Sequence, residues 1–128
     1  MNGDEIQLTL PADEAFHRVA HLVLGGLAVR LNLTFESLED LELALDALLE
    51  RRKTSEDIVL RVQVLDGALH TIVGPFASVR VELEQGGSGF TLSRILGAVC
   101  DGVEISDHDG SEWVELTKRV EKMEGAVG

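Results

Sequence analysis

The chain has 128 residues, the length of a single domain, and its 23 acidic and 11 basic residues give a net charge of −12. Such an acidic surface repels phosphate backbones and anionic lipid headgroups, and the longest apolar segment, residues 19–31, is broken by glycine and arginine, so neither nucleic acid nor a membrane is an expected partner. A single cysteine, Cys100, and a start without a signal-peptide pattern predict a cytoplasmic protein in which that thiol is packed rather than reactive.

Residues 5–10 alternate apolar and polar side chains, which predicts a short, half-buried strand. A helix is expected next, because Pro11 suits a first helical position and Asp13 and Glu14 favour the positive end of the helix dipole. Its apolar stripe recurs at steps of three and four residues: Phe16, Val19, Ala20, Val23, Leu24, Leu27 and Leu31.

A second helix is predicted after Thr34, whose hydroxyl can cap it while Leu33 and Leu38 clamp the entry as a hydrophobic staple. The core stripe of this helix is Leu38, Leu41, Leu45, Leu48 and Leu49. Its solvated side is Glu39, Glu42, Asp46 and Glu50.

The period then changes to two, and residues 58–73 are predicted to form a β-hairpin around an Asp66-Gly67 turn. The stretch Gly74-Pro75-Phe76 is expected to break the second strand. For residues 77–85, both a short edge strand and a lid loop fit the pattern.

A third helix, with Leu92, Ile95, Leu96 and Val99 on its apolar side, is followed by a closing hairpin whose turn is residues 107–110. This order predicts an α+β two-layer sandwich, with helices on one face of a mixed, mostly antiparallel sheet. We expect one domain over residues 1–128, with a core of about 5–120 and a tail at 121–128.

Four segments resemble those of a known family in their order along the chain and in their residue pattern. They read LTLPADEAFHRVAHLVLGGLAVRLNL, SLEDLELALDALLERR, GSGFTLSRILGAVCDGVEI and GSEWVELTKRV. They are similar to the small bacterial anti-sigma factor kinases, serine-protein kinases of the histidine kinase-like (GHKL) ATPase superfamily. The resemblance implies the histidine kinase-like ATPase fold, ATP and Mg bound between helices and sheet, a homodimer, and a sigma factor or an anti-anti-sigma factor as partner.

The family's first sequence box is an acid followed four residues later by an Mg-binding asparagine, and the matching positions here hold Ala47 and Arg51. Neither residue can perform those roles, so we expect no catalytic residue and no metal ligand. Shifting the match by one residue would use Asp46 and Glu50, but it would turn the helix by about 100° and move the leucine stripe out of the core. Arg51 fits either a phosphate contact or a solvated helix end.

The second box is an aspartate before a Gly-x-Gly turn. Gly74 matches the turn, but no carboxylate precedes it, so adenine recognition is not expected. The third box is a Gly-x-Gly followed by an apolar residue and, two positions on, a leucine, and Gly87-Ser88-Gly89-Phe90-Thr91-Leu92 fits it in full. Its glycines would bring backbone N–H groups to a phosphate at a helix start. The candidate nucleotide contacts are therefore Gly87, Gly89, Phe90, Thr91, Arg51 and Gly74. A flexible entry loop to the third helix is the alternative for residues 87–91.

Other polar residues have simpler explanations. His17 and His21 lie one helical turn apart but lack a third metal ligand of suitable spacing, so a solvated flank is expected. Residues 107–109 fit a hairpin turn. Ser88 and Ser93 have no nearby histidine and acid to activate them, which argues against a hydrolase.

The leading hypothesis is an anti-sigma-factor-like regulator that sequesters its protein partner and has a degenerate ATP site. One alternative is an active serine/threonine kinase that phosphorylates an anti-anti-sigma factor through an unconventional site. Another is a non-catalytic ligand-binding or scaffolding domain. Whether the chain is an enzyme stays open at this stage.

Overall fold

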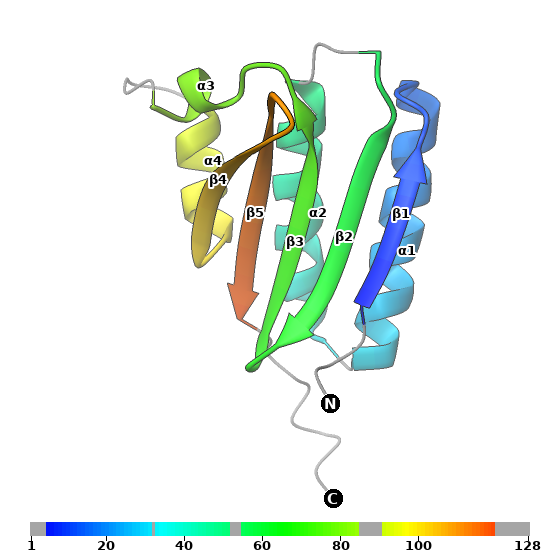
Figure 1. Cartoon of the computed structure of the whole chain (residues 1–128). Helices are drawn as coiled ribbons and strands as arrows, with labels where there is room; N and C mark the ends of the chain where they lie inside the picture. Colours follow the sequence, from blue (N-terminus) through cyan, green and yellow to red (C-terminus); the bar gives the residue numbers. More distant parts are fainter. Residues whose placement is uncertain (1–4, 32, 52–54, 85–90, 120–128) are drawn as a thin grey trace, which may run out of the picture.

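The computed structural model describes residues 5–31, 33–51, 55–84 and 91–119. Its elements are shown in Figure 1. In chain order they are β1 (Glu5–Leu10), the 3-10 turn η1 (Glu14–Phe16), α1 (His17–Leu31), α2 (Phe35–Glu50), β2 (Ile58–Leu65), β3 (Ala68–Phe76), α3 (Arg80–Glu84), α4 (Leu92–Val99), β4 (Gly102–His108) and β5 (Ser111–Arg119).

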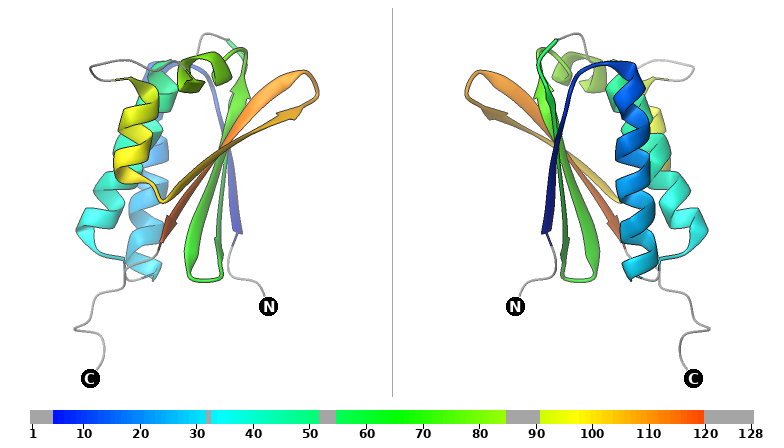
Figure 2. Two further views of the ribbon diagram at one scale, coloured as in Figure 1. Left: turned by 90° about the vertical axis from the view of Figure 1, so that its left-hand side faces the viewer. Right: turned by 90° about the vertical axis from the view of Figure 1, so that its right-hand side faces the viewer.

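The five strands form one sheet in the order β1-β2-β3-β5-β4, and each neighbouring pair of the described strands is antiparallel. Figure 2 shows that α1, α2 and α4 all cover the same face of this sheet, while the tip of the β4–β5 hairpin bends away from them. The predicted α+β two-layer sandwich is confirmed. Burial is therefore concentrated between the helices and one face of the sheet.

The core lies between the helices and alternate residues of the central strands. From the sheet it takes Leu60, Val62, Leu69, Val73, Val114 and Leu116. From α2 it takes the predicted stripe, of which Leu41, Leu45, Leu48 and Leu49 are buried and Leu38 is packed against the cluster. Each such buried side chain stabilises the fold by about 1.5–3 kcal/mol relative to exposure. The period of the α2 leucines therefore fixes which face of the helix meets the sheet.

The predictions that rest on short sequence motifs, namely the cap of α2 and the Asp66-Gly67 hairpin turn, are confirmed. Thr34 caps α2, with its Oγ1 accepting the backbone N–H of Ser37 at 3.1 Å. Asp66 and Gly67 have φ angles of 52° and 74° at the β2–β3 turn, the left-handed geometry expected of that pair. Asp109 and Gly110 repeat it at 53° and 79° in the β4–β5 turn. These short motifs position the strands and α2.

The start of the first helix differs from the prediction. Asp13 does cap a turn, accepting the Ala15 N–H on its side chain at 2.9 Å, but that turn is the 3-10 segment η1 and α1 begins at His17. A 3-10 turn rotates about 120° per residue instead of 100°, so it carries Phe16 off the apolar stripe. Phe16 is accordingly 39% exposed, whereas Ala20, Leu24 and Leu27 are buried as predicted.

The predicted break at Gly74 is wrong, because β3 continues to Phe76. Gly74 still pairs with Val59 of β2, although the register against β5 shifts between Val73 and Phe76. The glycine allows a close approach, since a Cβ there would lie 2.5 Å from ring carbons of Trp113. Phe76 is buried and holds the end of the strand in the core.

Residues 80–84 form a helix, α3, so both expectations for this part of 77–85 are wrong; residue 85 lies outside the described residues. The cause is a distant carboxylate. Glu112 of β5 accepts the backbone N–H groups of Val79 and Arg80 at 2.6 and 2.8 Å, which satisfies donors at the helix start. The side chain of Arg80 in turn donates to Asp107 at 2.9 Å.

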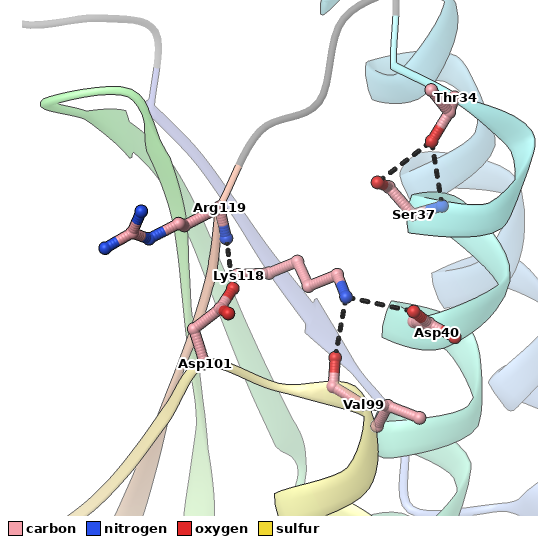
Figure 3. A network of polar contacts seen from close by, with 7 residues as sticks. All are labelled: Thr34, Ser37, Asp40, Val99, Asp101, Lys118 and Arg119. Atoms are coloured by element: carbon pink, nitrogen blue, oxygen red, sulfur yellow. Dashed lines mark hydrogen bonds and ion pairs between the residues drawn. The ribbon is translucent and has the colours of Figure 1, made fainter.

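Lys118 of β5 ties the sheet to two helices, as Figure 3 shows. Its Nζ donates to Asp40 Oδ2 of α2 at 2.9 Å and to the backbone oxygen of Val99, at the C-terminal end of α4, also at 2.9 Å. The second bond satisfies a carbonyl in the last turn of α4 and places a positive charge at the negative end of its dipole. Only 18% of the Lys118 side chain is exposed, so water competes weakly for these bonds.

Replacing Lys118 with methionine should lower the free energy of unfolding by about 1–3 kcal/mol, because Met keeps the apolar stem but leaves Asp40 and the Val99 carbonyl without their donor. Urea unfolding followed by circular dichroism measures this. The matched control is Arg119→Met on the exposed neighbour. If the two variants were equally stable to within about 0.5 kcal/mol, the contacts of Lys118 with Asp40 and Val99 would not stabilise the fold.

Candidate functional site

The two positions of the first family box lie on α2 as the sequence match places them. Ala47 is buried, and Arg51 is the C-cap residue one turn further on. The Arg51 guanidinium folds back, with Nη1 donating to the Ala47 backbone oxygen at 2.9 Å. This cation therefore stabilises the negative end of the α2 dipole.

The segment of β3 that matches the second box, residues 71–76, contains no carboxylate residue. Thr71 and Val73 point into the core from β3, and Ile72 lies on the opposite face of the sheet. Among the described residues, the Thr71 hydroxyl is a buried side-chain group with no hydrogen-bond partner. Gly74, proposed as a nucleotide contact, is buried under the indole of Trp113.

Most of the third box lies outside the described residues, which include neither Gly87, Ser88, Gly89 nor Phe90. Thr91 is described and caps α4, with its Oγ1 accepting the Arg94 N–H at 3.2 Å. The phosphate-binding role of the glycines therefore stays a prediction.

A groove of about 610 Å³ runs between α2 and α4. We call it the α2–α4 groove. Its lining residues are Leu43, Asp46, Ala47, Glu50, Arg94, Ile95, Ala98 and Val99. Ala47, at the family's acid position, supplies a methyl group to one wall. At this position the groove is apolar.

Sequence reasoning gave Asp46 and Glu50 no place at the site, yet both line this groove. The leucine stripe stays buried, so the helix is not rotated. Glu50 lies four residues after Asp46 and three after Ala47, so its spacing links it to both positions on the helix surface, which could have been used to find them. Arg94 was also missed, because its approach to α2 depends on how α4 packs.

His21 was expected to face solvent from the side of the first helix, and it does not. Its Nε2 lies 2.7 Å from Asp46 Oδ1 and its Nδ1 lies 3.5 Å from Glu42 Oε2, so this α1 side chain contacts two carboxylates of α2. The contact orients Asp46 at the edge of the groove. Within residues 5–31, 33–51, 55–84 and 91–119, no group of three or more His, Cys, Asp or Glu side chains is placed to hold a metal ion.

The remaining candidates have structural roles. The predicted turn at residues 107–110 is too long, because Asp107 and His108 belong to β4 and pair with Glu112 and Ser111 of β5, which leaves Asp109 and Gly110 as the turn. Ser93 borders a second pocket of about 340 Å³ beside α3 and β4. Cys100 is half-buried against the core, as the packed-thiol interpretation predicted. None of the helices in the described part of the chain combines the length and the hydropathy needed to span a bilayer.

No protein-family model matches the chain. The serine-protein kinase RsbW of Bacillus subtilis strain 168 is 26% identical over 142 residues, covering 91% of this chain and 86% of RsbW. A crystal structure of the RsbU and RsbW domains of Rv1364c from Mycobacterium tuberculosis matches with a TM-score of 0.69 at 18% identity, over 91% of this chain. The match spans 32% of that longer protein. These matches confirm the resemblance to the anti-sigma factor kinases and their GHKL-type fold.

Stability should fall as the pH rises from about 9 to about 11, because burial raises the pKa of the Cys100 thiol from 9.0 to about 11, and the nearby Lys118 charge offsets only part of this. In that window the unfolded chain ionises the thiol and the folded chain does not, so unfolding is favoured. Urea unfolding at about pH 8 and about pH 10.5 measures the loss. Cys100→Ala should show a smaller loss than the parent, and an identical loss in both would contradict the assignment.

Proposed function

We propose that this homologue of RsbW is an anti-sigma-factor-like regulator that acts by sequestering a protein partner, and that its ATP site is degenerate. The observation that carries the proposal is the buried methyl group of Ala47 where the family pattern has an acid. A methyl group can neither accept a proton nor polarise water. Kinase chemistry by the family's residues therefore has no general base in this chain.

The described residues do not fit Mg–ATP as the family pattern would bind it. Arg51 replaces the amide ligand with a cation, which repels Mg instead of coordinating it. The part of β3 just before Gly74 offers Thr71, Ile72 and Val73 in place of the carboxylate that would accept from adenine. We therefore derive no phosphoryl-transfer step for this site.

The partner we propose is a sigma factor or an anti-anti-sigma factor, held by surface contact in the cytoplasm. A net charge of −12 attracts a basic patch on such a partner and speeds the encounter. We further propose that residues 1–128 act as one domain and that the chain works as a homodimer. Nucleic acid and membranes are not proposed partners.

One observation favours a second candidate, an active serine/threonine kinase with an unconventional site. Asp46 lies next to Ala47 along α2 and lines the same groove, and its carboxylate is 2.7 Å from His21 Nε2. A carboxylate beside a histidine is a reasonable general base. In this candidate Asp46→Asn would abolish phosphorylation of the partner, whereas in the leading one there is no phosphorylation to abolish.

Titrating the purified chain with a fluorescent ATP analogue, with and without Mg, tests the degenerate site. We expect no Mg-dependent binding, because neither the acid nor the amide of the Mg site is present. RsbW of Bacillus subtilis, measured in parallel, is the positive control. Tight binding that requires Mg would overturn the degenerate-site proposal and favour the kinase.

Co-purification from the native host tests sequestration. Recovery of a sigma factor or an anti-anti-sigma factor with the chain in nucleotide-free buffer is the expected outcome. Repeated recovery of neither protein would favour a ligand-binding or scaffolding domain instead.

A further inference from the structure

We propose that the α2–α4 groove binds an amphipathic helix of the partner protein, with the apolar side of that helix in the groove and a lysine or arginine directed at Asp46 and Glu50. The inference rests on the proposed function, because it assigns the surface by which the chain holds its partner.

The floor of the groove is apolar and extends along two neighbouring helices. Leu43 of α2 is 52% exposed, and Ile95 and Ala98 of α4 line the same space. Leu43 and Ala47 are four residues apart on α2, and Ile95 and Ala98 are three residues apart on α4, so their side chains form two apolar ridges. Apolar ridges on two packed helices form a channel that accepts the apolar stripe of a third helix.

The charges on the two walls differ. Asp46 and Glu50 lie on the α2 wall, and Arg94 is the basic residue on the α4 wall. Among the described residues, neither Glu50 nor Arg94 has an ion-pair partner for its side chain. An occupant therefore binds most tightly when it presents a cation to α2 and no cation to α4.

The groove is held open before any partner arrives. Lys118 joins Asp40 of α2 to the Val99 carbonyl of α4, and Val99 itself lines the groove. On the other side, His21 of α1 fixes Asp46. A preformed groove spares its occupant the cost of ordering it.

A fluorescein-labelled helical peptide tests the proposal by anisotropy with the full chain. Its leucines repeat at i, i+3, i+4 and i+7, with lysines on one flank and glutamates on the other. The control peptide carries glutamates on both flanks. We expect the lysine peptide to bind at least about tenfold more tightly, with the difference shrinking as salt is added.

Two variants locate the binding. Ala98→Trp fills the groove from an exposed position of α4 and should abolish binding, while Glu50→Gln should weaken it several-fold without altering the core. Glu39→Gln removes an exposed charge of α2 that does not line the groove, so it should bind like the parent. Equal affinity for the two peptides, or unchanged binding by Ala98→Trp, would overturn the proposal.

The outcomes separate this inference from the proposed function. If Ala98→Trp still recovers the sigma factor or its antagonist, sequestration stands and the groove assignment fails. If neither protein is recovered but the peptides bind in the expected order, the groove assignment stands and the sequestration proposal fails.

Discussion

The ammonium group of Lys118 sets how the helix layer is attached to the sheet. It extends from β5 into the helix layer and donates to Asp40 of α2 and to the last turn of α4. Apolar burial holds the two layers together but is non-directional, so by itself it leaves helices free to slide. A charged donor with two acceptors at 2.9 Å fixes one position. Next to it, Asp101 accepts the Arg119 N–H at 2.7 Å and fixes the segment after α4.

This attachment sets the position of α2 relative to α4. With α2 and α4 held at Val99, the space between them is a groove whose walls are set by the α2 sequence. In the family pattern α2 carries an acid and an amide. Here the acid position is Ala47, which lines the groove, and the amide position is Arg51, which caps the end of α2. The fold is therefore retained while the chemistry of the wall has changed, which is why fold likeness alone does not assign kinase activity. An apolar wall with carboxylates at its edge suits a protein side chain better than a triphosphate.

The sequence predicted the features that depend on near neighbours. Thr34 caps α2 within three residues, and Asp66-Gly67 sets a turn by its own φ preferences. It missed what depends on contacts between distant segments. The helix at 80–84 forms because Glu112 satisfies its first N–H groups, and β3 continues past Gly74 because Trp113 packs on it.

The residues of the candidate site were likewise predicted where they depend on near neighbours and missed where they depend on contacts between helices. The Ala47 and Arg51 positions follow from the helical period, and the structure places them one turn apart as expected. The contact of His21 with Asp46 spans 25 positions, and the approach of Arg94 to α2 spans two different helices. A one-dimensional pattern carries no information on such pairs unless the packing of the helices is already known.

Methyl NMR of alanine-labelled protein observes the Ala47 methyl group itself and therefore reports on what binds beside it. We expect this resonance to stay in place when Mg–ATP is added and to move when a sequestered partner binds. A shift of the Ala47 methyl that requires both Mg and ATP would contradict this expectation.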